Sequence, residues 1–360
     1  MEIQHYIITN VTEDDLATAW TDEYGVKYSQ DGKKLLFAPN NLKEYTIKEG
    51  TIVICDEAFS EGLKYNILES ITFPDSVKVI GNEAFRDCCR LSLETLPKYI
   101  VSIGTKAFSG CESIVKLAIP NTVNHIGDDA FYGCKALVNV NIPKSITKIG
   151  RCMFQGCAIK SIEIPNNVSR IGFGAFYGCE ALKSIIVPDS VTSIGDCAFS
   201  GCRSLTNVSI PNSLTEIGAE VFWGCAITTL IVPDSIKKIG NRAFGGCNLY
   251  SITIPDSVKT IEGGAFYGCP FLSATIPNSI TKIEDETFYE CFALKQINIP
   301  NSVTEIGNFS FYNCAFIEIK LPNSIVRIGD HAFNYCESLK HIVIPDSVEI
   351  IEDGAFQYCI

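Results

Sequence analysis

Apolar residues return along this chain in one fixed arrangement, with a period of 22 or 23 residues. Thirteen prolines, from Pro74 to Pro345, mark the period. When each proline is counted as position 0, position 3 is always Val, Ile or Leu, and positions 6, 11 and 14 are always Ile, Phe and Cys. One unit has about seven apolar residues on one side, too few for a core of its own, so the pattern predicts units that stack and share one core.

Two extended segments are predicted in each unit. In residues 204–218, Val208 and Ile210 alternate with polar neighbours and indicate a short strand, and a second extended stretch follows from Leu214 to Ile217. Because the same strand returns one period later, consecutive strands must lie parallel, about 4.8 Å apart. The glycine that usually occupies position 7 is expected to permit a turn with positive φ. Residues 196–202 are short enough for a single helical or 3-10 turn.

The repeated unit resembles a known family. Residues 205–225 read LTNVSIPNSLTEIGAEVFWGC, which is similar to the BspA-like class of leucine-rich repeats, with Val221 in place of the usual Ala. The resemblance implies a horseshoe-like α/β solenoid that is dominated by β structure, with parallel strands on one face, short helical or 3-10 turns and about 13 to 14 repeats. It also implies a surface protein of the kind that adheres to host cells and matrix proteins.

The two ends of the chain predict different structures. Residues 1–46 are expected to form an N-terminal cap, made of a short helix begun by Thr12 and a hairpin around Asp31 and Gly32. Residues 47–360 are expected to form the solenoid, with an incomplete last repeat. No cap is visible after the last cysteine, so a dimer contact or further repeats are expected at that edge.

Position 2 forms a polar column, with Ser in ten copies and Thr122, Asn167 and Tyr99 in the others. Stacked hydroxyl groups can satisfy backbone groups where the strand bends away. The unit from Cys88 to Ile103 is irregular, because Tyr99 interrupts this column and Glu94 occupies a position that is otherwise apolar. A local distortion is expected there.

Cysteine invites a redox or metal interpretation, since the chain has 17. Thirteen of them share position 14, which should face inward, where a free cysteine acts as a small hydrophobe. The sequence favours a column of reduced, buried thiols over disulfides, which would force each cysteine to choose between two equivalent neighbours. No C-x-x-C pair is present, so we expect no metal and no cofactor.

Charge narrows the possible partners. The formal net charge of −12 argues against nucleic acid and against anionic membrane surfaces, and no apolar run is long enough to span a bilayer. Most carboxylates are assigned to solvent-facing positions, and no catalytic motif is present, so an enzyme is not expected. The N-terminus does not look like a signal peptide. The localisation therefore stays open between a cell-surface or secreted protein, as the resemblance implies, and a cytoplasmic one.

Binding is expected at variable positions, because the invariant ones build the fold. Positions −5, −4 and −2 should point outward from the sheet and form a concave, hydroxyl-rich face for a protein or glycan partner. In the central repeats these residues are Lys183, Ser184, Ile186, Thr206, Asn207, Ser209, Thr228, Thr229, Ile231, Tyr250, Ser251 and Thr253. The alternative is that they are simply β-favouring residues on an open sheet.

A second candidate surface lies at position 12, where aromatic side chains recur. These are Tyr132, Tyr177, Trp223, Tyr267, Tyr289 and Tyr312. They could anchor a partner, or they could cover the turn between repeats. The sequence thus predicts a non-enzymatic interaction scaffold, most simply an adhesin-like surface protein, with an intracellular scaffold of a larger assembly as the alternative.

Overall fold

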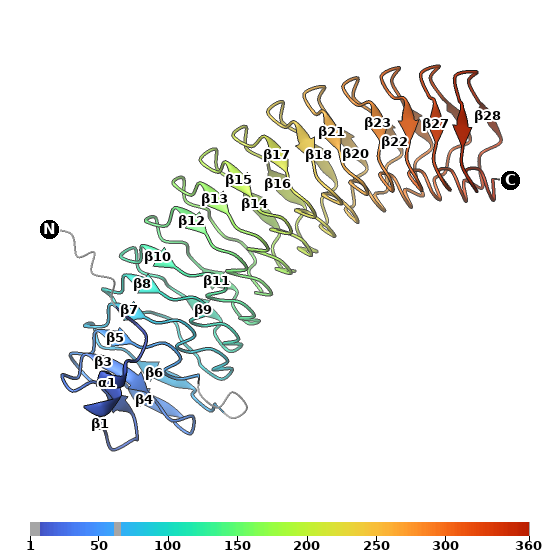
Figure 1. Ribbon diagram of the computed structural model, residues 1–360. Helices are drawn as coiled ribbons and strands as arrows, with labels where there is room; N and C mark the ends of the chain where they lie inside the picture. Colours follow the sequence, from blue (N-terminus) through green and yellow to red (C-terminus); the bar gives the residue numbers. More distant parts are fainter. Residues whose placement is uncertain (1–7, 61–65, 360) are drawn as a thin grey trace. The chain divides into compact units, whose positions relative to one another are not determined.

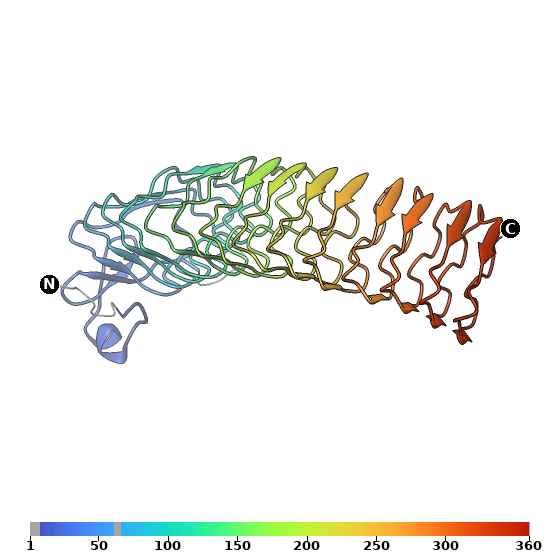
Figure 2. The ribbon, with the colours of Figure 1, turned by 90° about the horizontal axis from the view of Figure 1, so that it is seen from above.

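The computed structural model describes residues 8–60 and 66–359, which form two compact units, Met1–Leu182 and Lys183–Ile360 (Figure 1). Each unit is a stack of coils, one coil for each sequence repeat. Most coils have a strand just before their proline and a second strand shortly after it; the coils of Pro97 and Pro165 have no regular strand before the proline. We call these the pre-proline and post-proline rows, and Figure 2 shows them on different sides of the coils.

The pre-proline row pairs in parallel, as expected from the repeat. In the first unit its strands are β4 (Glu44–Thr46), β6 (Ser70–Thr72), β9 (Lys116–Leu117) and β11 (Asn139–Val140). In the second unit they are β14 (Ser184–Ile186), β16 (Asn207–Ser209), β18 (Thr229–Ile231), β20 (Ser251–Thr253), β22 (Ser273–Thr275), β24 (Gln296–Asn298), β26 (Glu318–Lys320) and β28 (His341–Val343). Pairing is in register, with Ile185 opposite Val208.

The post-proline row consists of two-residue strands at positions 5 and 6. In the first unit they are β5 (Val53–Ile54), β7 (Val79–Ile80), β8 (Ser102–Ile103), β10 (His125–Ile126), β12 (Lys148–Ile149) and β13 (Arg170–Ile171). In the second they are β15 (Ser193–Ile194), β17 (Glu216–Ile217), β19 (Lys238–Ile239), β21 (Thr260–Ile261), β23 (Lys282–Ile283), β25 (Glu305–Ile306), β27 (Arg327–Ile328) and β29 (Ile350–Ile351). Both predicted extended segments are confirmed, and the second is shorter than expected.

The N-terminal residues lie against the first coils. Thr12 caps α1 (Glu13–Ala17) with a capping box to Asp15, and Asp15 also pairs with Lys34 at 2.8 Å. Antiparallel strands β1 (Trp20–Thr21), β2 (Lys27–Tyr28) and β3 (Lys34–Phe37) follow. Since β3 also pairs in parallel with β5, the hairpin is continuous with the post-proline row.

The predicted helical or 3-10 turns are absent from the repeats that the structure describes. Instead, two residues in each coil adopt the left-handed conformation, at positions 9 and 13, as Glu83 (φ 53°) and Asp87 (φ 57°) do. A helix cannot continue through such residues. Some backbone N–H groups of this segment bond to the next coil and others bond within their own coil. The N–H of Phe85 donates to the carbonyl of Ala107 in the next coil, and the N–H of Cys88 donates to the carbonyl of Phe85 in the same coil.

The expected role of the glycine at position 7 is wrong. Gly104 does not have a positive φ, and its role is to permit close approach, because a Cβ atom there would lie 2.5 Å from the backbone nitrogen of Asn82 in the preceding coil. No real Cβ tolerates that distance. The coils touch backbone to backbone at this position.

The core is a set of columns of identical residues. Within the first unit, Phe85 stacks on Phe108 at 5.3 Å between ring centroids, and their planes differ by 4°. Within the second, Phe222 stacks on Phe244 at 5.6 Å. Such aromatic contacts add to the stabilisation that ring burial already gives.

The cysteine column lies beside the phenylalanines. None of the 17 cysteines, all of which fall within the described residues, forms a disulfide. The Sγ–H of Cys111 donates to the carbonyl oxygen of Phe85 at 3.1 Å, and Cys225 makes the same contact with Phe199 at 3.2 Å. Burial raises the pKa of the Cys179 thiol to about 12. The column is therefore buried as predicted and without disulfides in this structure, and its hydrogen bonds tie each coil to the preceding one.

Most of the polar column at position 2 bonds to the backbone, whereas among the described residues the buried hydroxyls of Ser76, Ser235 and Ser302 have no hydrogen-bond partner. Ser257 donates to the carbonyl of Ile236 at 2.9 Å, and the Asn167 side-chain amide donates to Ile146 at 3.0 Å. The distortion expected around Glu94 is also present, because the pre-proline strand of that coil is reduced to one bridge, between Thr95 and Ala118.

Replacing one ring of the phenylalanine column tests the stack. Phe199→Ala is expected to lower the free energy of unfolding by about 3–5 kcal/mol, because it removes a fully buried ring that stacks on Phe222 at 5.7 Å. Urea unfolding followed by circular dichroism measures it. The control Phe292→Ala removes a ring that is 61% exposed and should change the value by less than about 0.5 kcal/mol. Equal effects of the two substitutions would contradict the core assignment.

Thiol labelling tests the cysteine column. In the native protein at neutral pH, a maleimide should modify the exposed Cys89 first and the half-buried Cys197 and Cys359 more slowly. The rest should react only after denaturation, because burial hides the thiols and raises their pKa, which leaves little reactive thiolate. Labelling of Cys89 should accelerate as the pH rises towards its raised pKa. Mass spectrometry of tryptic peptides identifies the sites, and rapid native labelling of Cys179 would refute the column.

Candidate functional site

The pre-proline face of the second unit is open to solvent. Of the twelve residues predicted there, eleven are exposed and Thr228 is partly covered. The side chains of Ile186 and Ile231 are 76% and 80% exposed, and Tyr250 is 56% exposed. Lys183 is the one charged member, so strands β14, β16, β18 and β20 present a hydroxyl-rich surface with isolated aliphatic side chains.

Strand pairing fixes the spacing of this face. Ile186 lies opposite Ser209, and Ile231 lies opposite Thr253, each on directly paired parallel strands. Between these outward residues the inward ones, such as Leu230, are buried in the core. The face therefore has a rigid backing and is not a loop.

In the second unit, the side chains of the predicted aromatic row contact one another. Trp223 contacts Tyr267 at 5.7 Å between centroids, Tyr267 stacks on Tyr289 at 4.9 Å, and Tyr289 stacks on Tyr312 at 4.6 Å. We call these four residues the aromatic ladder. Gly245 leaves the intervening coil without a side chain at position 12, and the Trp223 indole lies across that space.

Sequence reasoning missed residues beside the ladder, among them Phe309, whose ring centroid lies 6.1 Å from that of Tyr312. Tyr335, at position 13, contacts Tyr312 at 5.5 Å and stacks on Tyr358 at 4.6 Å. The guanidinium of Arg242 lies 5.7 Å from the Trp223 ring and pairs with Glu286 at 3.0 Å. The sequence signal that could have found Tyr335 is an aromatic residue at position 13, one position after the recurring aromatic position 12.

The two members of the row in the first unit are not joined. Tyr132 and Tyr177 are 42% and 43% exposed, and Gln155 occupies position 12 in the coil between them. No ring contact links the two tyrosines within the described residues of that unit. The aromatic side chains therefore form a continuous row in the second unit alone.

Several carboxylates that were assigned to solvent have a structural role. Asp196 accepts the backbone N–H of Ala219 in the next coil at 2.9 Å, and Asp285 accepts that of Asn308 at 2.8 Å. Both lie at position 8, where eight of the thirteen copies have Asp or Asn, and this bias was the signal available in the sequence. These residues form a second polar column and are not candidates for binding.

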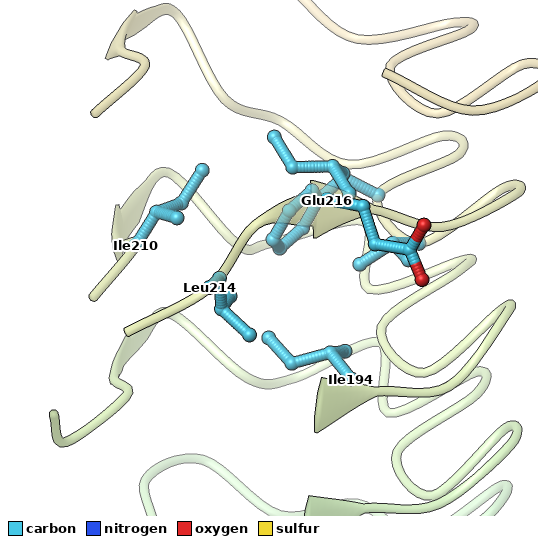
Figure 3. Close-up of a pocket in the computed structure, with 7 residues that line it drawn as sticks. Ile194, Ile210, Leu214 and Glu216 are labelled. Carbon is cyan, nitrogen blue, oxygen red and sulfur yellow. The ribbon is translucent and has the colours of Figure 1, made fainter. Parts of the chain in front are cut away.

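Enclosed space is scarce. A cavity of about 10 Å³ lies between coils of the second unit, with room for about one water molecule. Figure 3 shows that aliphatic side chains, including Ile194 and Leu214, line it, with Glu216 at its edge. No group of three His, Cys, Asp or Glu side chains is placed to hold a metal ion in residues 8–60 and 66–359. Within the same residues, no helix has the length and apolar character needed to cross a membrane.

A parallel β-solenoid with columns of Ile, Phe and Cys and an open strand face defines a leucine-rich-repeat scaffold. This chain belongs to the BspA type: the family model for the BspA type leucine rich repeat region, of six copies, matches residues 33–160, 148–273, 215–315 and 259–360. Membership of this family implies a protein-interaction scaffold, and its members typically have no enzymatic activity. No curated protein matches the chain significantly.

Solved structures agree with this assignment. A leucine-rich repeat protein from Bacteroides ovatus is 29% identical, with a TM-score of 0.71, and the match covers 100% of this chain and 86% of that one. A leucine rich cell surface protein from Faecalibacterium prausnitzii is 28% identical, with a TM-score of 0.65, over 90% of this chain and 94% of that one.

Substitution of Gly245 tests the aromatic ladder. In Gly245→Ala the new Cβ would overlap the Trp223 indole, so the indole should leave Tyr267 and its fluorescence emission should shift to longer wavelength. The experiment uses a Trp20→Phe background, which leaves Trp223 as the one tryptophan. The control Gln357→Ala changes the same repeat position, away from Trp223, and should leave the emission unchanged. An unaltered spectrum for Gly245→Ala would contradict the ladder geometry.

Proposed function

We propose that this protein is an adhesin-like interaction scaffold at a cell surface, which binds a host or neighbouring-cell protein through the pre-proline face of the second unit. The observation that carries the proposal is the exposure of Ile186 and Ile231, at 76% and 80%, on a rigid and nearly uncharged sheet. Burial of such side chains by a partner is favourable by about 25 cal/mol for each Å² of apolar surface. Hydroxyl groups of Ser209 and Thr253 beside them supply hydrogen bonds.

The location at a surface is supported by the description of the Faecalibacterium prausnitzii protein as a cell surface protein, at 28% identity. The column of reduced thiols supports the alternative, an intracellular scaffold that uses the same face for a partner in its own cell. The aromatic ladder is a second proposed contact surface, because tyrosine and tryptophan are enriched where interfaces have their strongest contacts.

A pull-down tests the proposal. The full chain serves as bait against host matrix and epithelial extracts and, in parallel, against a lysate of its own organism. Saturable capture from the host extracts is expected, and Ile186→Asn combined with Ile231→Asn should weaken it by roughly tenfold or more, since two buried anchors are lost.

The matched control is Val343→Asn, which changes a residue of the same position −2 and similar exposure, 77%, on β28 outside the proposed face. Capture should survive this substitution. Capture from the own lysate alone would favour the intracellular alternative, and equal losses in both variants would remove the face from the proposal.

A further inference from the structure

One position of the first unit carries a side chain that the solenoid does not require. Position 2 is Ser in ten coils, and in several of them, as at Ser257 and Ser347, its hydroxyl donates to a backbone carbonyl of the preceding coil. Tyr99 takes that position in the irregular coil, where its ring is 44% exposed. The same coil has lost its regular pre-proline strand. Departures from a consistent pattern that bring no gain in packing are expected at functional sites.

Two ammonium groups converge on the Tyr99 ring. Lys78 Nζ lies 4.6 Å from the ring centroid and Lys98 Nζ lies 5.0 Å from it. Each contact with the ring is favourable, but the two like charges repel each other. Neither lysine forms an ion pair with a carboxylate in the part of the chain that the structure describes. The pair is therefore a positive site that lacks a counter-charge.

The positive surface continues over the following coils of the same unit. His125, Lys148 and Arg170 all occupy position 5 and are exposed. Ser102 of β8 pairs with His125, and Lys148 pairs directly with Arg170. Burial and the nearby charge of Lys148 lower the pKa of His125.

Lys144 occupies position 1, as Lys98 does, and is also exposed. We define the basic stripe as Lys78, Lys98, His125, Lys144, Lys148 and Arg170. None of its lysines, nor Arg170, makes an ion pair within residues 66–359.

The net charge of the chain hides this stripe. Residues 98–170 contain nine Lys and Arg against four Asp and Glu, a local charge of +5, although the whole chain has −12. Of the nearby acids, Asp128 accepts the backbone N–H of Arg151 at 2.9 Å, and its negative charge also acts on His125. Four of the five successive coils carry a Lys or Arg of the stripe, and His125 of the remaining coil is uncharged at neutral pH because its pKa is lowered. Neighbouring coils are about 4.8 Å apart along the stack.

We propose that the basic stripe binds a sulfated glycan, laid along the stack of coils. Sulfate groups would pair with the ammonium and guanidinium groups, and the exposed side chains of Asn121, Asn124 and Thr147 would bond to sugar hydroxyls. Duplex DNA is the poorer fit, because it has one charge for about every 1.7 Å of its axis, far denser than one cation for each coil. The inference rests on the proposed role as an interaction scaffold, and it concerns a different unit and a different ligand.

Binding of the full chain to immobilised heparin tests the inference. We expect saturable binding that weakens as salt is added, because the contacts are ionic. Lys78→Gln with Lys98→Gln, and separately Lys148→Gln with Arg170→Gln, should each reduce affinity by roughly tenfold. Tyr99→Ser restores the residue of the repeat and should also weaken binding, without loss of stability.

The matched control is Lys237→Gln with Lys259→Gln. These lysines occupy position 4, as Lys78 does, in coils of the second unit, and their Nζ groups contact the backbone carbonyls of Asp234 and Asp256. The control makes the same change in net charge and should bind heparin as the wild type does. Thermal melts confirm that all variants are folded.

Three results would overturn the inference: no heparin binding at low salt, an equal loss in the control, or equal binding to the unsulfated glycan hyaluronan or to duplex DNA. Heparin binding needs no protein partner. A failed pull-down with retained heparin binding would therefore count against the proposed function alone, and the reverse result would count against the basic stripe alone.

Discussion

The distance between coils, about 4.8 Å, is the constraint on which the rest of this structure depends. Backbone hydrogen bonds fix that distance, so each side chain must fit against the residue at the same position one coil away. Flat Phe rings can stack there, as Phe85 and Phe108 do, and a small thiol can reach the carbonyl of the preceding coil. At position 7 of most coils, as at Gly104, a Cβ would lie too close to the preceding coil, so glycine is usual there and Glu262, Glu284 and Glu352 are the exceptions. Because each side chain packs against its own copy in the next coil, the chain repeats the same amino acid at a position and not merely a similar one.

The same constraint organises the surface. A residue type that recurs at one outward position becomes a line along the stack, whatever its chemistry. Aromatic residues form the ladder of the second unit, and cations form the basic stripe of the first. Carboxylates at position 8 bond to the backbone of the next coil and so belong to the fold. A line of like groups suits long partners, such as an extended surface of another protein or a polymer, better than small molecules.

Much of the fold could be predicted because the chain contains thirteen copies of the unit, so that each position can be compared across the copies. The period, the parallel strands, the buried columns and the distorted coil at Glu94 all follow from it. The left-handed residues at position 9 could not be predicted, since Glu83, Lys106 and Cys152 carry no glycine signal. Net charge concealed the basic stripe, whose members are far apart in sequence and meet through stacking. Tyr335 escaped notice because the turn lets a residue at position 13 reach the ring at position 12.

The thiol column also requires that folding precede oxidation of the cysteines. Once stacked, a thiol such as Cys111 is shielded, and its hydrogen bond to Phe85 holds the sulfur in place. Before stacking, all 17 thiols of the chain are open to oxidants and to one another. An oxidised sulfur is larger and more polar, and it no longer fits between coils. The coils must therefore stack before the thiols are oxidised. Once they have stacked, the buried thiols are protected and stay reduced in any later environment.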